Sequence, residues 1–209
     1  LFDPSHPREK PCGGGVTGRA LAMVQGVVPV GHLPAVRIRQ ARFRDTSTRL
    51  DATVPLPDAT TTLVVASRAD FDGLLYKAAI DAGAIPVAAR VTAIAPTAGH
   101  IRLATADGGL FTASHVVGAD GVNGLVRRRM STPFRRNQLS IATGFFAHGA
   151  ASEEIVIELI ANPPGYIWSF PRPTHLAIGV CVQADCGVGV DRLRYLVREW
   201  IDATGIARG

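Results

Sequence analysis

A glycine-rich segment near the amino terminus is the first candidate for cofactor chemistry. The run Gly13-Gly14-Gly15-Val16-Thr17-Gly18 contains the spacing G-x-G-x-x-G, which in nucleotide-binding folds holds a pyrophosphate at a helix N-terminus. That motif requires a buried strand directly before it, whereas residues 7–12 are polar and include two prolines. Two alternatives remain: a bare backbone that a flat or anionic ligand can approach closely, or a flexible surface turn.

The cysteines and histidines form neither a metal-binding nor a disulfide pattern. Cys12, Cys181 and Cys186 include no C-x-x-C pair, and the six histidines are scattered. We therefore expect no metal site, no disulfide framework and a reducing, cytoplasmic setting. Cys12 beside the glycines is either a small packing thiol or a chemically active group.

Three aromatic residues alternate along an apolar segment near the end of the chain. In a strand, the side chains of Tyr166, Trp168 and Phe170 would point to one face. They form either ordinary sheet core or one wall of a cavity for an apolar ligand.

The charge balance favours no nucleic-acid partner. The formal net charge is +5, and five arginines fall within residues 127–136. However, the cluster lacks the interleaved aromatics of single-strand binders, and only Lys10 and Lys77 among the 22 basic residues are lysines. We therefore interpret the arginine content as a bias of overall composition and expect no nucleic-acid partner.

Periodicity predicts a mixed α/β chain. With 47% hydrophobic residues over 209 positions and no apolar run of about 20 residues, the chain reads as globular, without a membrane span. Ser67, three residues before Asp70, predicts the start of a helix, and Gly83 predicts its end. The expected strands are 62–66, 85–95, 100–106, 110–117, 139–147, 154–160, 166–170 and 174–182, the last four forming an antiparallel sheet, and the expected helices are 68–82, 122–130 and one around 193–201.

Four segments, in this order, resemble the geranylgeranyl-reductase group of FAD-dependent oxidoreductases, within the class that includes para-hydroxybenzoate hydroxylase. They are Lys10-x-Cys12-Gly13-Gly14-Gly15; Arg68, Phe71, Asp72, Leu74 and Leu75 followed by Gly83-Ala84; Gly118-Ala119-Asp120-Gly121-x-Asn123-x-x-Val126-Arg127; and Tyr166-x-Trp168-x-Phe170-Pro171. The resemblance spans about residues 1–182. It implies an incomplete FAD-binding Rossmann-like domain with a β-meander over 1–130 and a partial substrate domain, with an antiparallel sheet and a terminal helix, over 131–209.

The resemblance also implies roles for individual residues. The implied cofactor-binding residues are Asp3 at the adenosine ribose, Gly13, Gly14 and Gly15 near the flavin ring, Arg68 at the flavin phosphates, Val91 near adenine, and Gly118, Asp120 and Gly121 around the ribityl chain. Cys12 would lie beside the isoalloxazine as a catalytic candidate, and Tyr166, Trp168 and Phe170 would border the substrate cavity. From the residues alone, Asp3 equally fits an Asx turn and Asp120 a helix cap.

The function that follows from the resemblance is reduction of a carbon–carbon double bond in an isoprenoid or another hydrophobic small molecule. FAD would be the cofactor, NAD(P)H or another compound the electron donor, and the apolar substrate suggests peripheral contact with a membrane surface. The alternatives are a class A flavin monooxygenase or halogenase, and a non-catalytic fragment unable to bind FAD alone. A fragment is expected because Leu1 to Pro4 reads as the end of a strand and residues 184–209 lack the family's later Gly-Asp segment.

Overall fold

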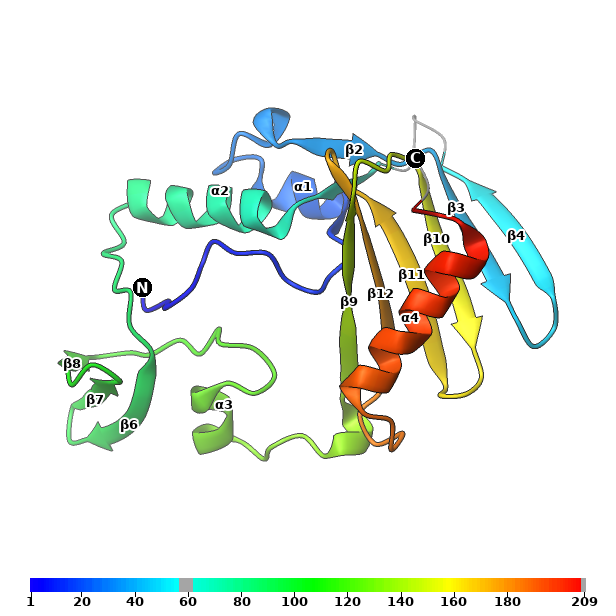
Figure 1. Ribbon diagram of the computed structural model, residues 1–209. Helices are drawn as coiled ribbons and strands as arrows, with labels where there is room; N and C mark the ends of the chain where they lie inside the picture. Colours follow the sequence, from blue (N-terminus) through cyan, green and yellow to red (C-terminus); the bar gives the residue numbers. More distant parts are fainter. Residues whose placement is uncertain (57–61, 208–209) are drawn as a thin grey trace. The chain divides into compact units, whose positions relative to one another are not determined.

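The computed structural model describes residues 1–56 and 62–207 (Figure 1). It confirms the mixed α/β class and divides into two compact units: residues 1–6 with 79–135, and residues 7–78 with 136–209. These units differ from a single division after residue 130, because the strand at residues 40–45 pairs with the strand at residues 154–160 and the strand at residues 50–55 pairs with that at 40–45. No helix in the described ranges is both long enough and apolar enough to cross a membrane.

The larger unit is built on a six-stranded sheet in the order β4-β3-β10-β11-β12-β9. Its strands are β3 (Gln40–Asp45), β4 (Leu50–Pro55), β9 (Ser140–His148), β10 (Glu154–Ile160), β11 (Gly165–Pro171) and β12 (His175–Gln183). The four strands expected between 139 and 182 are confirmed within about one residue. These four strands pair antiparallel with one another, as expected. The sheet is larger than expected, because β3 and β4 extend it and β3 pairs with β10 in parallel.

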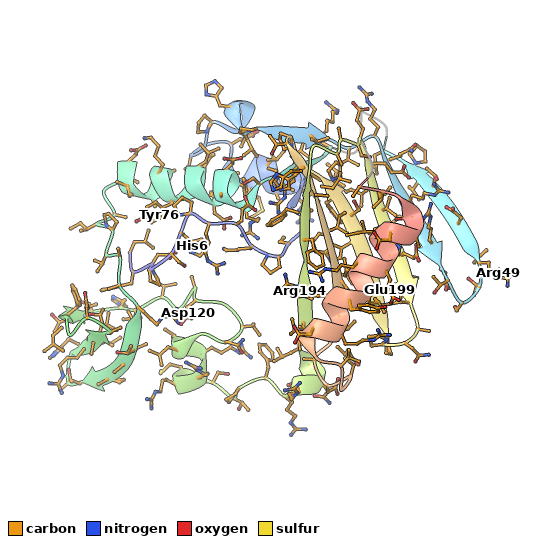
Figure 2. All side chains as sticks on the ribbon, viewed as in Figure 1. His6, Arg49, Tyr76, Asp120, Arg194 and Glu199 are labelled. Carbon is orange, nitrogen blue, oxygen red and sulfur yellow. The ribbon has the colours of Figure 1, made fainter. Side chains whose placement is uncertain are left out.

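Helix α4 (Val190–Thr204) covers one face of this sheet (Figure 1). The predicted apolar stripe is confirmed: Leu193, Val197 and Trp200 are buried and pack with the sheet residues Ile178 and Val180 in one core. Charged residues such as Arg194 and Glu199 belong to the same helix (Figure 2). The helix ends where Gly205 adopts a left-handed conformation, with φ of 65°.

The opposite face of the sheet carries the alternating aromatics. Trp168 on β11 lies in register with Ile157 on β10 and Gly179 on β12, and Ile157 lies in register with Phe43 on β3. Because paired residues point to the same side of a sheet, this face is apolar across its width. Its exposed apolar members include Phe43, Val54, Phe146, Leu159 and Tyr166.

A small antiparallel sheet in the order β1-β5-β2 completes the larger unit. Its strands are β1 (Gly15–Thr17), β2 (Ala35–Arg37) and β5 (Leu63–Ala66), accompanied by α1 (Gly18–Val24), η1 (Val30–His32) and η2 (Arg136–Gln138). Helix α2 (Arg68–Asp81) follows β5 as predicted. Ser67 Oγ accepts the Asp70 N–H at 3.2 Å, and Gly83, with φ of 96°, follows the last turn, so both predicted helix signals are confirmed.

The smaller unit contains the predicted meander β6 (Val91–Thr97), β7 (His100–Thr105) and β8 (Leu110–Ala113), then α3 (Leu125–Met130). Three expected bounds are wrong. Residues 85–90 and 114–117 form no meander strand, because β7 pairs only from Val91 on one side and up to Ala113 on the other. The helix expected from 122 begins at Leu125, directly after Gly124.

The contact between α4 and the sheet generates a stability prediction. Leu193→Ala should lower the free energy of unfolding by about 2–5 kcal/mol, since it leaves a cavity in a fully buried position. Urea denaturation followed by circular dichroism measures this. Val190→Ala on the same helix, at a 47% exposed position, is the control and should change stability by no more than about 0.5 kcal/mol. Equal effects of the two changes would contradict the packing described.

Candidate functional site

The carboxylate of Glu9 connects the segment before the glycines to the start of α2. Its Oε1 accepts hydrogen bonds from Ser67 Oγ and from the Ala69 N–H, the latter at 3.2 Å. Its Oε2 accepts a hydrogen bond from Arg172 Nη1. A negative charge at the first turn of a helix complements the helix dipole, so Glu9 stabilises both α2 and the buried charge of Arg172.

Arg172 directly follows β11, and its side chain is completely buried. Its guanidinium forks: Nη1 donates to Glu9, and Nη2 donates to the Cys12 carbonyl oxygen at 2.7 Å. The ring of Phe146 lies 5.2 Å from the guanidinium carbon. A buried charge of this kind persists only when it is paired and hydrogen-bonded, as this one is.

A second charged group lies on the first turns of α2. Arg68 donates to both carboxylate oxygens of Asp72, one turn further on, at 2.8 and 2.9 Å from Nη2. Lys10 Nζ donates to Asp72 Oδ2 at 2.8 Å, and Arg68 Nη1 lies 3.7 Å from Cys12 Sγ. Two cations share one carboxylate, so this cluster carries a formal charge of +1 beside the thiol.

The protonation equilibria of these groups reflect their pairing. Burial alone would raise the pKa of Asp72, but hydrogen bonds from Lys10 and Arg68 lower it below its usual range. Burial would also raise the pKa of Glu9, but hydrogen bonds from Ser67, Arg172 and Ala69 lower it. Burial would lower the pKa of Arg68, but its contacts with Asp72 and Cys12 raise it. Both carboxylates are therefore ionised at neutral pH.

The triglycine is packed against protein on two sides. A Cβ on Gly13 would lie 2.7 Å from the Phe170 ring, and one on Gly14 would lie 2.1 Å from the Ala66 carbonyl oxygen. Gly14 also has φ of 88°, which disfavours other residues. A flexible surface turn is therefore wrong for Gly13 and Gly14: close approach of Phe170 and of β5 requires glycine at both positions. No strand precedes the motif in the described chain, in line with the argument against a dinucleotide fingerprint.

The aromatic side chains of β11 line a pocket together with this loop. The pocket has a volume of about 280 Å³, and Gly13, Ile157, Leu159, Tyr166, Trp168 and Phe170 form its walls. The rings of Trp168 and Phe170 meet edge to face, with centroids 5.8 Å apart. Trp168 also borders a second pocket of about 150 Å³, whose lining includes Glu9, Lys10 and Phe146. The three aromatic side chains therefore line open space, and their role at a substrate stays a prediction.

The remaining predicted site residues belong to the smaller unit. Asp3 accepts hydrogen bonds from the Ser5 and His6 amides at 3.0 and 2.9 Å, which is the Asx turn considered above. His6 Nδ1 lies 2.6 Å from the same carboxylate. Burial would raise the pKa of Asp3, but the hydrogen bonds from Ser5 and His6 lower it. Val91 is the half-buried first residue of β6.

Asp120, in the loop that leads to α3 (Figure 2), acts as a helix cap: its Oδ2 accepts the Leu125 N–H at 2.5 Å. Gly118 leaves the space that the Val126 side chain fills, and Gly121 has φ of 82°. These contacts give each residue a structural role, and the cofactor roles implied by resemblance stay predictions.

The structure thus brings Cys12–Gly15, Arg68 and the aromatic wall together in one unit. It adds Glu9, Lys10, Asp72 and Arg172, none of which the sequence analysis assigned a role in the site. Asp72 lies one helical turn after Arg68, a spacing at which ion pairs form, so this partner was accessible from the sequence. Arg172, a lone charge within the apolar run 165–182, was the available signal for a buried ion pair.

No family model matches the sequence. An uncharacterized protein of Methanosarcina barkeri is 25% identical over 183 residues, which cover 84% of this chain and 45% of that protein. Among solved structures, a geranylgeranyl bacteriochlorophyll reductase-like protein of Thermoplasma acidophilum superposes with a TM-score of 0.77 at 18% identity, over 99% of this chain and 54% of that one. The halogenase PltM, in complex with phloroglucinol and FAD, gives 0.67 at 12% identity, over 96% of this chain and 50% of that one.

The structural likenesses establish the fold that this chain shares with the reductase-like protein and the FAD-containing halogenase. The chain spans about half the length of the proteins that it matches.

The packing of Phe170 on Gly13 predicts the effect of a single methyl group. Gly13→Ala should destabilise the protein by about 1–3 kcal/mol, because the new Cβ collides with the Phe170 ring. Thermal and urea unfolding measure the loss. Gly26→Ala is the control, since a Cβ there meets nothing within 4 Å. Adding Phe170→Leu to Gly13→Ala should recover part of the loss, and a purely additive double mutant would contradict this contact.

The lowered pKa values of Asp72 and Glu9 predict an acid-sensitive fold. A carboxylate with a depressed folded pKa contributes stability that is complete above its unfolded pKa of about 4 and is lost as the pH falls through the folded pKa. Asp72→Asn should therefore flatten the dependence of the unfolding free energy on pH below about pH 4, by up to about 1.4 kcal/mol per pH unit. Urea titrations at several pH values measure the slope, and identical slopes for parent and variant would refute the assignment.

Proposed function

We propose that the chain is part of an FAD-dependent oxidoreductase that reduces a carbon–carbon double bond of an isoprenoid or another hydrophobic small molecule. The observation that carries the proposal is the contact between the glycine loop and the aromatic wall. Phe170 packs on Gly13, and both line the same apolar pocket beside Cys12. In the resembling reductases, this loop lies near the flavin ring and the wall borders the substrate.

The charged cluster on α2 suits the polar part of the cofactor. Arg68 and Lys10 outnumber Asp72 by one positive charge, and the Arg68 side chain is 29% exposed, so an anionic phosphate can reach it. In the smaller unit, Asp3, Val91, Gly118, Asp120 and Gly121 would contact the adenosine and ribityl parts, as the resemblance implies. When bound, FAD supplies the redox chemistry, accepting two electrons from a donor such as NAD(P)H and passing them on as hydride.

The substrate class follows from the apolar sheet face. The pocket lining includes the exposed Leu159, and the exposed Phe43 of β3 pairs with the lining residue Ile157, so this apolar face suits an extended hydrocarbon. Reduction adds a hydride to one alkene carbon and a proton to the other. Cys12 is the catalytic candidate for supplying that proton, since its thiol adjoins the pocket residue Gly13 and its sulfur lies 3.7 Å from Arg68 Nη1. A substrate of this kind favours peripheral contact with a membrane surface, and the cytoplasmic setting expected from the cysteine pattern is part of the proposal.

A monooxygenase or halogenase is the second candidate, favoured by the TM-score of 0.67 to an FAD-containing halogenase. The two candidates differ in their use of oxygen. Oxygen consumption or hydrogen peroxide release coupled to NAD(P)H oxidation would indicate the second. Anaerobic saturation of an isoprenoid double bond would indicate the first.

Flavin retention tests the proposal directly. The chain and a form extended to the length of its relatives should be purified, and the extended form should carry the yellow absorbance of bound flavin. If the chain itself is colourless while the extended form is yellow, the chain is a fragment that cannot hold FAD alone. If neither form binds FAD, the proposed function is wrong.

Arg68→Met in the flavin-binding form should weaken FAD affinity about 10- to 100-fold, because the cluster of Arg68, Lys10 and Asp72 loses the net positive charge that attracts a phosphate. Equilibrium titration with FAD measures the change. Arg192→Met on α4 removes an arginine that lies over the Tyr195 ring and should leave the affinity unchanged. Unchanged affinity in Arg68→Met would remove Arg68 from the cofactor site.

A further inference from the structure

The fully buried guanidinium of Arg172 makes contacts that a purely space-filling residue would not. Nη1 and Nη2 donate to two different acceptors, the Glu9 carboxylate and the Cys12 carbonyl oxygen, which both precede the triglycine. The Arg172 backbone is anchored as well, since its N–H donates to the His175 carbonyl oxygen at 2.8 Å across the turn between β11 and β12. One side chain therefore joins the glycine loop to the hairpin that carries the aromatic wall.

We propose that Arg172 is a positioning residue that fixes the Cys12–Gly15 loop against the aromatic wall and thereby controls the exposure of the Cys12 thiol. The three glycines have no side chains with which to hold a conformation, so the loop must be fixed from outside. Phe170 lies on β11, and Arg172 directly follows that strand two residues later. Phe170 holds the loop at Gly13, and Arg172 holds it at the preceding peptide.

Glu9 makes this positioning specific to arginine. Its carboxylate neutralises the buried guanidinium. The same carboxylate accepts hydrogen bonds from Ser67 and Ala69, which connects the ion pair to the first turn of α2, the helix that begins at Arg68. A lysine at position 172 has one ammonium and no planar fork, so it cannot reproduce the two-armed contact with both acceptors. The loop, the wall and Arg68 are thus set by one ion pair. The consequence for catalysis rests on the proposed function, whereas control of the thiol does not.

The experiment measures the reactivity of Cys12 in the whole chain, without flavin. In a Cys181→Ser and Cys186→Ser background, the rate at which an aromatic disulfide reagent modifies Cys12 is measured in the parent protein and in three variants, Arg172→Lys, Arg172→Gln and Glu9→Gln. Losing a hydrogen bond from a charged donor should free the loop and raise the rate about tenfold or more in Arg172→Gln. Arg172→Lys and Glu9→Gln should each give a smaller increase.

Leu193→Ala separates positioning from general stability. It weakens the core beneath α4 and has no part in the loop, so it should lower the melting temperature while leaving the Cys12 rate at the parental value. A Leu193→Ala rate raised as much as that of Arg172→Gln would overturn the proposal, as would an unchanged rate in Arg172→Gln. If Arg172→Gln does not fold, unchanged rates in both Arg172→Lys and Glu9→Gln overturn it. Because the assay contains no FAD, failure of the proposed function leaves its result interpretable.

Discussion

The buried ion pair of Arg172 and Glu9 is the interaction on which the arrangement of the site depends. Moving a guanidinium out of water costs several kcal/mol, and pairing together with hydrogen bonding offsets that cost. Arg172 is paired with Glu9, 163 positions earlier in the chain, and donates its second arm to the Cys12 carbonyl oxygen, whereas its buried Nε has no hydrogen-bond partner among the described residues. The fold therefore cannot shift the loop, the start of α2 or the end of β11 independently, because each movement would leave a buried charge without its partner.

Glycine–aromatic contacts supply the second constraint. Phe170 occupies the space above Gly13, and Trp168 lies over Gly179 of the neighbouring strand, where a Cβ would meet the indole at 2.4 Å. Large rings fit close to the backbone only where side chains are missing, so the aromatic wall and the glycines depend on each other. The result is a sheet with two unlike faces. One is closed by α4 and forms the core, whereas the other keeps its aromatic rings beside open pockets.

The parts of this fold that the sequence predicts are those with local causes. Helix α2 has its Ser67 cap, α4 has its apolar stripe, and the four strands from 139 to 182 are bounded by turn residues. Strand β3 escaped prediction because its place depends on parallel pairing with β10, more than one hundred positions later. The same reason hides Glu9 and Arg172. For Asp3 and Asp120, the sequence offered both a local and a ligand role, and the hydrogen bonds establish only the local one.

The position of Asp72 changes what Arg68 can contribute to binding. An unpaired Arg68 would present all its N–H donors to a phosphate, but Arg68 Nε and Nη2 already donate hydrogen bonds to Asp72. Only Nη1 points elsewhere, toward the Cys12 sulfur. The attraction for an anion therefore comes from the net charge of the cluster, and Lys10 supplies the excess. In the proposed cofactor site, a phosphate would be recognised by Lys10 and Arg68 together, which adds Lys10 to the residues that the proposal assigns to that site.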